Sequence, residues 1–218
     1  MEPKETVYFA NPGPDGKFNH DYFFHWADFN NEPINDWKGI ASHLLSIPMA
    51  HQLIGFYSVA DDTDNILKVM RSYQYYAASA ISDKVARRNW KEEQLRGGYV
   101  WHTTGSGKTL TSFKSAQLIA NSGDADKVVF LMDRVELGTQ SLQEYRGFAE
   151  ASESVQATEN TDVLVSKLKS DNPANTLIVT SIQKMSRIEE EGGYRSKDIE
   201  KIRKKRIVFI IDEAHRDV

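Results

Sequence analysis

The chain has 218 residues, a formal net charge of −4 and no cysteine, so disulfides and thiolate metal sites are excluded. No apolar run approaches the roughly 18 residues of a membrane span, and the N-terminus lacks a signal-peptide pattern. The six histidines show no metal-ligand spacing, which argues against structural zinc. We therefore expect a cytoplasmic protein without a membrane partner, with length for one sizeable domain or one domain and part of another.

Residues 1–60 are rich in proline and aromatic residues. This composition predicts short strands and loops in which the aromatic rings pack a small hydrophobic layer, with a short helix over 37–46 that is broken near Pro48. Stacking of these rings on bases is the alternative, but few basic residues lie among them. Asp15 and the later Asp36-Trp37-Lys38 imitate a metal-dependent nuclease pattern. Because Asp15 lies in a Pro–Gly turn and not on a strand, we favour a structural role.

A new segment begins at residue 61, and a helix is predicted from Arg71 through Ile81 and Val85. It carries Gln74, whose amide offers the donor and acceptor that the edge of adenine requires. An exposed helical glutamine is the alternative, but its place about 30 residues before the loop described next favours an adenine-reading role. Residues 87–96 are predicted as a charged, exposed helix that Gly97-Gly98 ends.

The sequence TTGSGKT at 103–109 follows the apolar residues 99–101, a predicted strand, and precedes a helical pattern. Glycines let the backbone approach a polyanion, and a helix N-terminus favours phosphate. Lys108 supplies a charge for the β and γ phosphates, and the Thr109 hydroxyl is a magnesium ligand. The usual first glycine is replaced by His102, so an ordinary glycine turn is the alternative. The predicted ATP-binding residues are Gln74, Thr104, Gly105, Ser106, Gly107, Lys108 and Thr109.

The helix after this loop has an apolar face and ends near Gly123. Its predicted buried residues are Leu110, Phe113, Ala116 and Ile119.

Three further apolar runs, at 127–132, 177–179 and 207–211, predict strands. None of the four runs alternates with polar residues, so both faces are expected to be buried, as in a parallel sheet. Helical patterns at 135–148, 161–168 and 197–204 separate them. This alternation of strands and helices predicts a doubly wound α/β domain with its ligand beyond the carboxyl ends of the strands.

Asp212 and Glu213 follow the last strand. Apolar residues that end in two acids are typical of a magnesium site, in which Asp212 holds the metal and Glu213 orients the attacking water. With Lys108 these residues form the predicted catalytic set. His215 is interpreted as a link to a neighbouring domain or as a surface histidine.

Two loops at the same edge contain candidate DNA-binding residues, namely Arg134, Thr180, Ser181 and Gln183. Hydroxyls, helix N-termini and arginine are ligands of the phosphate backbone. Capping of the next helix by Thr180 or Ser181 is a compatible alternative. The basic run 203–206 is interpreted mainly as a solvated helix C-terminus, with DNA contact as the alternative.

Together these motifs, in this order, resemble the first half of a superfamily 2 helicase. The wording MRSYQYYA, GGYVWHTTGSGKTLTSFKSAQL, DR-x-x-L-x-x-Q and IIDEAHR resembles more narrowly the motor subunit of type I restriction-modification enzymes. The segment FFHWADFNN resembles the link between nuclease and motor in that subunit. The resemblance covers about residues 20–218.

The resemblance implies an α/β fold, a RecA-like P-loop NTPase domain with a mostly parallel sheet flanked by helices. It places a linker or the end of a nuclease region at 1–60 and the first RecA-like domain at 61–218. The implied activity is ATP- and Mg²⁺-dependent translocation on double-stranded DNA with remote cleavage, in a complex with methyltransferase and specificity subunits. A different superfamily 2 helicase, acting on RNA or DNA, and a non-catalytic nucleotide-binding docking module are the alternatives.

Overall fold

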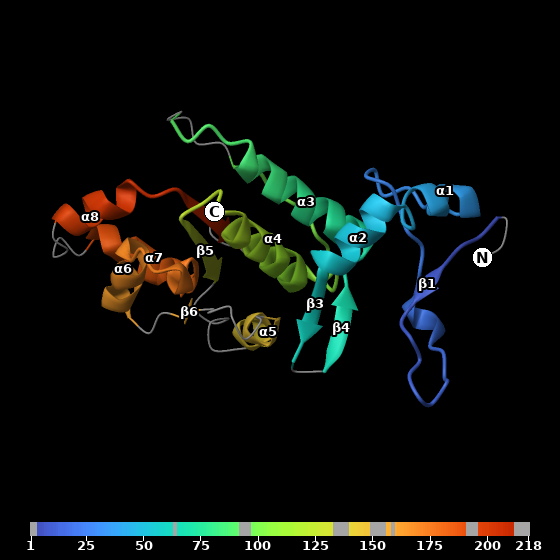
Figure 1. Ribbon diagram of the computed structural model, residues 1–218. Helices are drawn as coiled ribbons and strands as arrows, with labels where there is room; N and C mark the ends of the chain where they lie inside the picture. Colours follow the sequence, from blue (N-terminus) through green and yellow to red (C-terminus); the bar gives the residue numbers. More distant parts are fainter. Residues whose placement is uncertain are drawn as a thin grey trace. The chain divides into compact units, whose positions relative to one another are not determined.

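The computed structural model describes residues 4–62, 65–91, 97–132, 140–148, 156–157, 160–190 and 196–211. The chain divides into two compact units. The first comprises residues 1–58 and 69–77, and the second comprises residues 59–68 and 78–218. Figure 1 shows the elements of both units along the chain.

The first unit begins with two short antiparallel strands, β1 (Tyr8–Phe9) and β2 (Phe23–Phe24), with the turn η1 (His20–Tyr22) before β2. The strands lead to Trp26, which is 1% exposed. Its ring lies 6.3 Å from that of Tyr8 and 6.2 Å from that of Tyr75. The predicted short strands and small aromatic layer are therefore confirmed.

Two helices follow, α1 (Trp37–Ser42) and α2 (Ile47–Gly55). The predicted short helix is confirmed from Trp37, but it ends at Ser42 and not at 46, and Pro48 lies in the first turn of α2 and does not break a helix. Proline is tolerated there, since the first N–H groups of a helix have no partner within it. Asp36 caps α1 by accepting the Gly39 N–H at 2.8 Å. Within the described ranges, no group of three His, Cys, Asp or Glu residues could hold a metal ion.

A hairpin of β3 (Ser58–Asp61) and β4 (Ile66–Val69) precedes the long helix α3 (Ser72–Ala86). The predicted helix over 87–96 was wrong where the structure describes it, because α3 ends at Ala86 and residues 87–91 are not helical. This segment consists almost entirely of polar and charged residues, so it offers no apolar face whose packing could stabilise another helical turn.

The second unit is built on a four-stranded sheet in the order β6-β7-β5-β8. Its strands are β5 (Lys127–Met132), β6 (Gln156–Ala157), β7 (Leu177–Ser181) and β8 (Ile207–Ile211). Every neighbouring pair is parallel. This confirms the strands predicted at 127–132, 177–179 and 207–211 and their parallel pairing, whereas β6 was not predicted.

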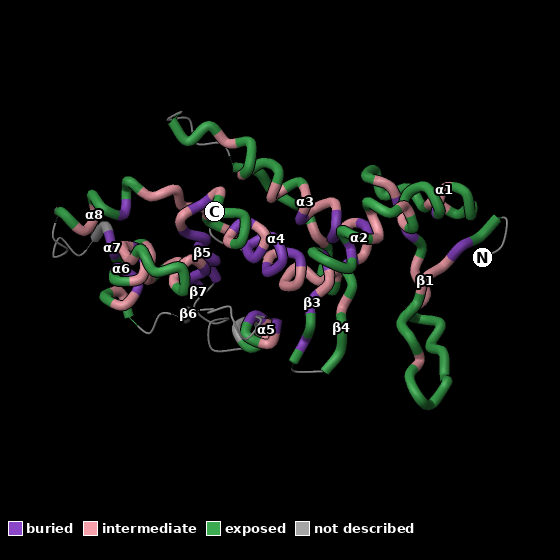
Figure 2. The backbone as a smooth tube through the Cα atoms, viewed as in Figure 1, coloured by how far each residue is buried: buried purple, intermediate pink, exposed green. Residues whose placement is uncertain are grey.

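Helices cover both faces of this sheet. On one face, α4 (Lys108–Ser122) and α5 (Gln140–Phe148) pack against alternate residues of β5 such as Phe130. On the other, α6 (Thr161–Lys169), α7 (Ile182–Glu190) and α8 (Ser196–Arg203) pack around Val129 and Leu131. The turn η3 (Pro173–Asn175) leads into β7. Figure 2 shows the buried strands between these helices. The α/β class with helices on both faces is thus confirmed.

The apolar run at 99–101 does not form the predicted strand. Tyr99 is 91% exposed and Trp101 is 88% exposed. A strand is held by ladder hydrogen bonds to a neighbour, and both edges of β5 are occupied by β7 and β8. Apolar character alone supplies no such neighbour. β8 was also expected to be buried on both faces, but Phe209 and Ile211 are 45% and 49% exposed.

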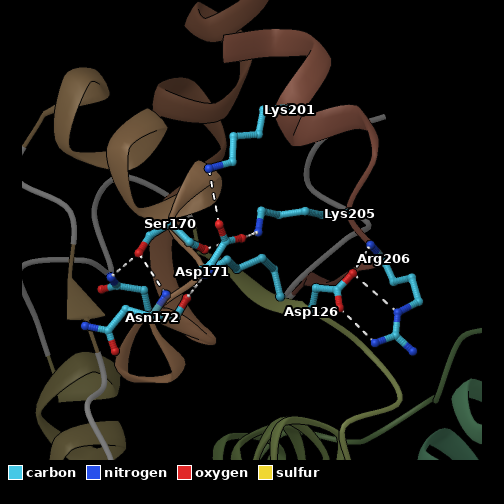
Figure 3. A network of polar contacts seen from close by, with 9 residues as sticks. Asp126, Ser170, Asp171, Asn172, Lys201, Lys205 and Arg206 are labelled. Atoms are coloured by element: carbon cyan, nitrogen blue, oxygen red, sulfur yellow. Dashed lines mark hydrogen bonds and ion pairs between the residues drawn. The ribbon is translucent and has the colours of Figure 1, made fainter. Parts of the chain in front are cut away.

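A polar network joins the amino ends of the strands (Figure 3). Arg206 donates from Nη2 to Asp126 Oδ1 at 2.8 Å and from its backbone N–H to Oδ2 at 2.7 Å. Lys205 and Lys201 both contact Asp171, at 2.6 and 3.2 Å. Two residues of the basic run at 203–206 are therefore engaged in ion pairs within the protein. No helix in the described part of the chain is long and apolar enough to cross a membrane.

Candidate functional site: a glycine-hinged loop at the start of α4

The loop over 103–109 ends where α4 begins, at Lys108, with Gly107 as the N-cap. Gly107 has φ 77° and ψ 42°, and Gly105 has φ 77°. Both values lie in the left-handed region, which a residue with a Cβ atom enters only at a cost. An added Cβ at Gly105 would meet no atom within 4 Å. The two glycines therefore shape the turn, and the space beside Gly105 is open to a ligand.

The part of the loop before the helix is a β-turn from Thr103 to Ser106. The Ser106 N–H donates to the Thr103 carbonyl at 3.3 Å, and the Ser106 hydroxyl donates to the same carbonyl at 2.7 Å. Gly105, at the third position of the turn, has the positive φ that a type II turn requires. Residues Thr103 to Ser106 thus form the turn through their own hydrogen bonds, without a ligand.

The side chain of His102 lies against this turn, with Nδ1 3.1 Å from Ser106 Oγ. Burial lowers the pKa of His102 below 6.5, and the charge of Lys108 lowers it further. Both effects favour the neutral form of the imidazole. The sequence showed His102 only as a missing glycine, and no pattern within the motif indicated that its side chain would contact the loop.

The connections of α4 fix the edge of the sheet at which the loop lies. Only residues 123–126 join the end of α4 to the start of β5, and Arg206 Nη2 donates to the Gly123 carbonyl at 3.1 Å. Such a short link makes α4 and β5 antiparallel. The 15 residues of α4 and the 6 of β5 both extend about 20 Å. The loop therefore lies at the carboxyl edge of the sheet.

The strand register brings three chain segments to that same edge. Met132 at the end of β5 pairs with Ser181 at the end of β7, and Leu131 pairs with Ile211 at the end of β8. Asp212 and Glu213 follow Ile211 in the sequence but lie outside the described residues, as do Arg134 and His215. Their roles stay predictions.

Thr180 and Ser181 belong to β7 and are 0% and 1% exposed. Ser181 Oγ accepts the Lys184 N–H at 3.3 Å, so the predicted capping of the next helix is confirmed. Gln183, in the first turn of α7, is exposed. DNA contact by these residues stays a prediction, and Gln183 is the one of the three whose side chain is accessible.

Gln74 belongs to the first unit, whereas the loop belongs to the second. It lies in the first turn of α3, is 5% exposed, and its Oε1 accepts the Arg71 N–H at 2.9 Å. This is the contact by which a glutamine at the third helical position satisfies the N-cap backbone. The structure thus gives Gln74 a capping role, and its contact with adenine stays a prediction.

The chemistry of the loop fits the phosphates of a nucleotide. Its two glycines have positive φ, the first N–H groups of α4 have no partner within the helix, and Lys108 stands at the first helical position. The helix dipole favours an anion at this end. Thr109 follows with a hydroxyl of the kind that binds Mg²⁺. The residues present are therefore suited to a magnesium–nucleotide complex.

Comparison with known proteins gives a consistent result. The family model for the SWI2/SNF2 ATPase matches residues 73–218. The chain is 38% identical over 212 residues to the type I restriction enzyme SauMSSORF170P endonuclease subunit of Staphylococcus aureus. That alignment covers 97% of this chain and 21% of the relative, so the chain spans about a fifth of that protein.

A second relative comes from Mycoplasma pneumoniae, the C-terminal part of the type I restriction enzyme MpnIIP endonuclease subunit. It is 40% identical over 195 residues, which covers 88% of this chain and 92% of the relative. The HindI endonuclease subunit of Haemophilus influenzae is 29% identical over 154 residues, which covers 69% of this chain and 14% of that protein.

Proposed function

We propose, from the premise that the chain belongs to the SWI2/SNF2 ATPase family and to the type I restriction enzyme endonuclease subunits, that it is the ATP-binding part of a DNA-translocating motor. In this proposal residues 61–218 form the first RecA-like domain and residues 1–60 a linker or the end of a nuclease region. The motor couples ATP hydrolysis to movement along double-stranded DNA and to remote cleavage. Its partners are the methyltransferase and specificity subunits of the restriction complex.

The observation that supports the proposal most is the position of the loop. α4 carries it to the carboxyl edge of the sheet, where β8 also ends at Ile211. In this proposal Lys108 contacts the β and γ phosphates, and backbone N–H groups from Thr104 to Thr109 surround them. The hydroxyl of Thr109 and the carboxylate of Asp212 hold Mg²⁺.

The bound magnesium–ATP complex supplies the free energy of phosphate hydrolysis. The chain's own residues orient and neutralise it, because Lys108 offsets the charge of the phosphates and Glu213 positions the attacking water. Gln74 contacts the edge of adenine. Arg134 and Gln183 contact the DNA backbone, and Thr180 and Ser181 join them if the end of β7 becomes accessible. These roles are those proposed from sequence.

The test is Lys108→Ala in the full subunit within its complex. We expect loss of ATP-dependent translocation on duplex DNA, because a loop without this cation neither orients nor neutralises the phosphates. Lys197→Ala is the matched control, since Lys197 is an exposed lysine at the start of α8 and should leave translocation unchanged. Translocation by Lys108→Ala at the wild-type rate would instead indicate a docking module. Preferential stimulation of ATP hydrolysis by RNA over duplex DNA would indicate an RNA helicase.

A further inference from the structure

The residue that stands in place of the first glycine of the loop is joined to the loop by a hydrogen bond. His102 Nδ1 lies 3.1 Å from Ser106 Oγ, which lies 2.7 Å from the Thr103 carbonyl oxygen. A hydroxyl has one hydrogen, and the shorter contact assigns it to the Thr103 carbonyl. His102 Nδ1 is therefore the donor to Ser106 Oγ, which fixes the Nδ1–H tautomer of the neutral ring.

The two contacts at Ser106 Oγ form a brace that links His102 to the turn. The Thr103 carbonyl accepts both the N–H and the hydroxyl of Ser106, and His102 Nδ1 contacts the same hydroxyl. A glycine at position 102 would leave the hydroxyl without this donor and would widen the conformations open to the backbone. The side chain of His102 is partly buried, and it contacts Ser106, which precedes Lys108 by two residues. Through this contact the imidazole acts on the part of the loop that leads to Lys108.

We propose that His102 is a positioning residue that pre-forms the phosphate loop through Ser106. The proposal rests on the proposed nucleotide-binding function and adds to it a residue that the loop pattern does not contain. Binding to a pre-formed loop loses less conformational freedom than binding to a loose one. Loss of the brace should therefore weaken nucleotide binding and leave the chemical step unchanged.

Two isosteric substitutions distinguish the role of Nδ1 from that of Nε2. The amide N–H of asparagine stands close to the place of Nδ1, whereas that of glutamine stands close to the place of Nε2. In the full subunit we expect His102→Asn to bind fluorescent ADP with Mg²⁺ within about 2-fold of wild type. His102→Gln and His102→Ala should raise the dissociation constant by about 2- to 10-fold, the net effect of one neutral hydrogen bond. KM for ATP should rise equally, with kcat unchanged.

Ser106→Ala supplies the second arm. It should weaken ADP binding as much as His102→Ala, and the double variant should be no weaker than either single variant, because both remove the same brace. Circular dichroism and thermal unfolding of each variant establish that it is folded. If His102→Ala does not fold, the comparison of the asparagine and glutamine variants gives the answer.

Three results would overturn the proposal. They are additive losses in the double variant, a glutamine variant that binds as wild type while the asparagine variant does not, and a fall in kcat with unchanged KM. Failure of the proposed function looks different, because Lys108→Ala would then leave ADP binding unchanged. If Lys108→Ala abolishes ADP binding while His102→Ala does not change it, only the inference about His102 is wrong.

Discussion

Phe113 joins the loop-bearing helix α4 to the core, so its truncation tests the packing that positions the site. Its side chain is 0% exposed. The ring lies edge-on to Tyr145, with centroids 5.2 Å apart and planes at 90°, and 5.6 Å from the ring of Phe148. Phe113→Ala therefore removes a buried ring from between α4 and α5.

The expected loss in the free energy of unfolding is about 3–5 kcal/mol, the range for truncation of a buried phenylalanine. The two aromatic pairs contribute about 0.5–1.5 kcal/mol each within that figure. Because a domain is stable by only about 5–15 kcal/mol in total, the variant should unfold at much lower urea concentration. The measurement is equilibrium urea unfolding of the 218-residue chain followed by circular dichroism, with the slope m compared between variants.

Phe209→Ala is the matched control. The same substitution is made on β8, but Phe209 is 45% exposed, so less apolar area leaves the core and the loss should stay below about 2 kcal/mol. If Phe113→Ala loses no more stability than Phe209→Ala, the assignment of Phe113 to the centre of the core is wrong, and with it the account of how α4 is held.

Three further predictions concern the ends of the sheet and the loop. Arg206 holds the pKa of Asp126 below its ordinary value, mainly through their side-chain hydrogen bonds. Because the folded state of Asp126 then binds protons less readily than the unfolded state, this stability is present above pH 4 and is lost as the pH falls through the lowered pKa. We expect Asp126→Asn to lose about 1 kcal/mol at pH 7 and the difference from wild type to shrink below about pH 4, as measured by urea unfolding. An equal loss of unfolding free energy in Asp126→Asn at pH 7 and at pH 3 would contradict the lowered pKa of Asp126. Burial lowers the pKa of Lys127 from 10.5 to about 8, so the unfolded state holds more protons between those values and stability rises with pH. Between pH 7 and pH 10 the melting temperature of wild type should rise relative to that of Lys127→Met. Melting temperatures that change equally with pH in the two proteins would refute the lowered pKa of Lys127. Because Gly107 has φ 77°, Gly107→Ala should lower the free energy of unfolding by about 1 kcal/mol and weaken ADP binding. Gly97→Ala is the control and should be neutral, since an added Cβ there meets no atom within 4 Å. Equal losses of stability in the two variants would show that the positive φ is unimportant.

The polar network at the amino edge joins the start of β8 to the start of β5. The backbone N–H groups of Asp126 and Lys127 donate to the Arg206 carbonyl at 2.8 and 3.1 Å, while the Arg206 side chain returns to the Asp126 carboxylate. Arg206 lies 80 positions after Asp126 in the sequence, and no sequence pattern pairs them. Their contact follows from the parallel order of the strands, and it fixes the register that brings Ile211 beside Leu131.

The sequence by itself determined the features that depend on local backbone chemistry. The unbroken apolar runs predicted β5, β7 and β8, because successive apolar residues are typical of strands in a parallel sheet. The glycines of the loop and Gly123 predicted the two ends of α4, because left-handed backbone favours glycine. A helix cap was predicted at Thr180 or Ser181, since a hydroxyl satisfies a nearby N–H, and Ser181 is the residue that forms it.

Only the tertiary structure decided the features that need a distant partner. Tyr99 and Trp101 have the composition of a strand, yet they remain exposed because a ladder requires a neighbour. The start of α7 was predicted through its cap but its extent was not, even though Ile182, Met185 and Ile188 recur at helical spacing. The brace between His102 and Ser106 depends on how the loop folds back on the residue before it. Such contacts arise from the path of the chain in space, which residue types alone do not specify.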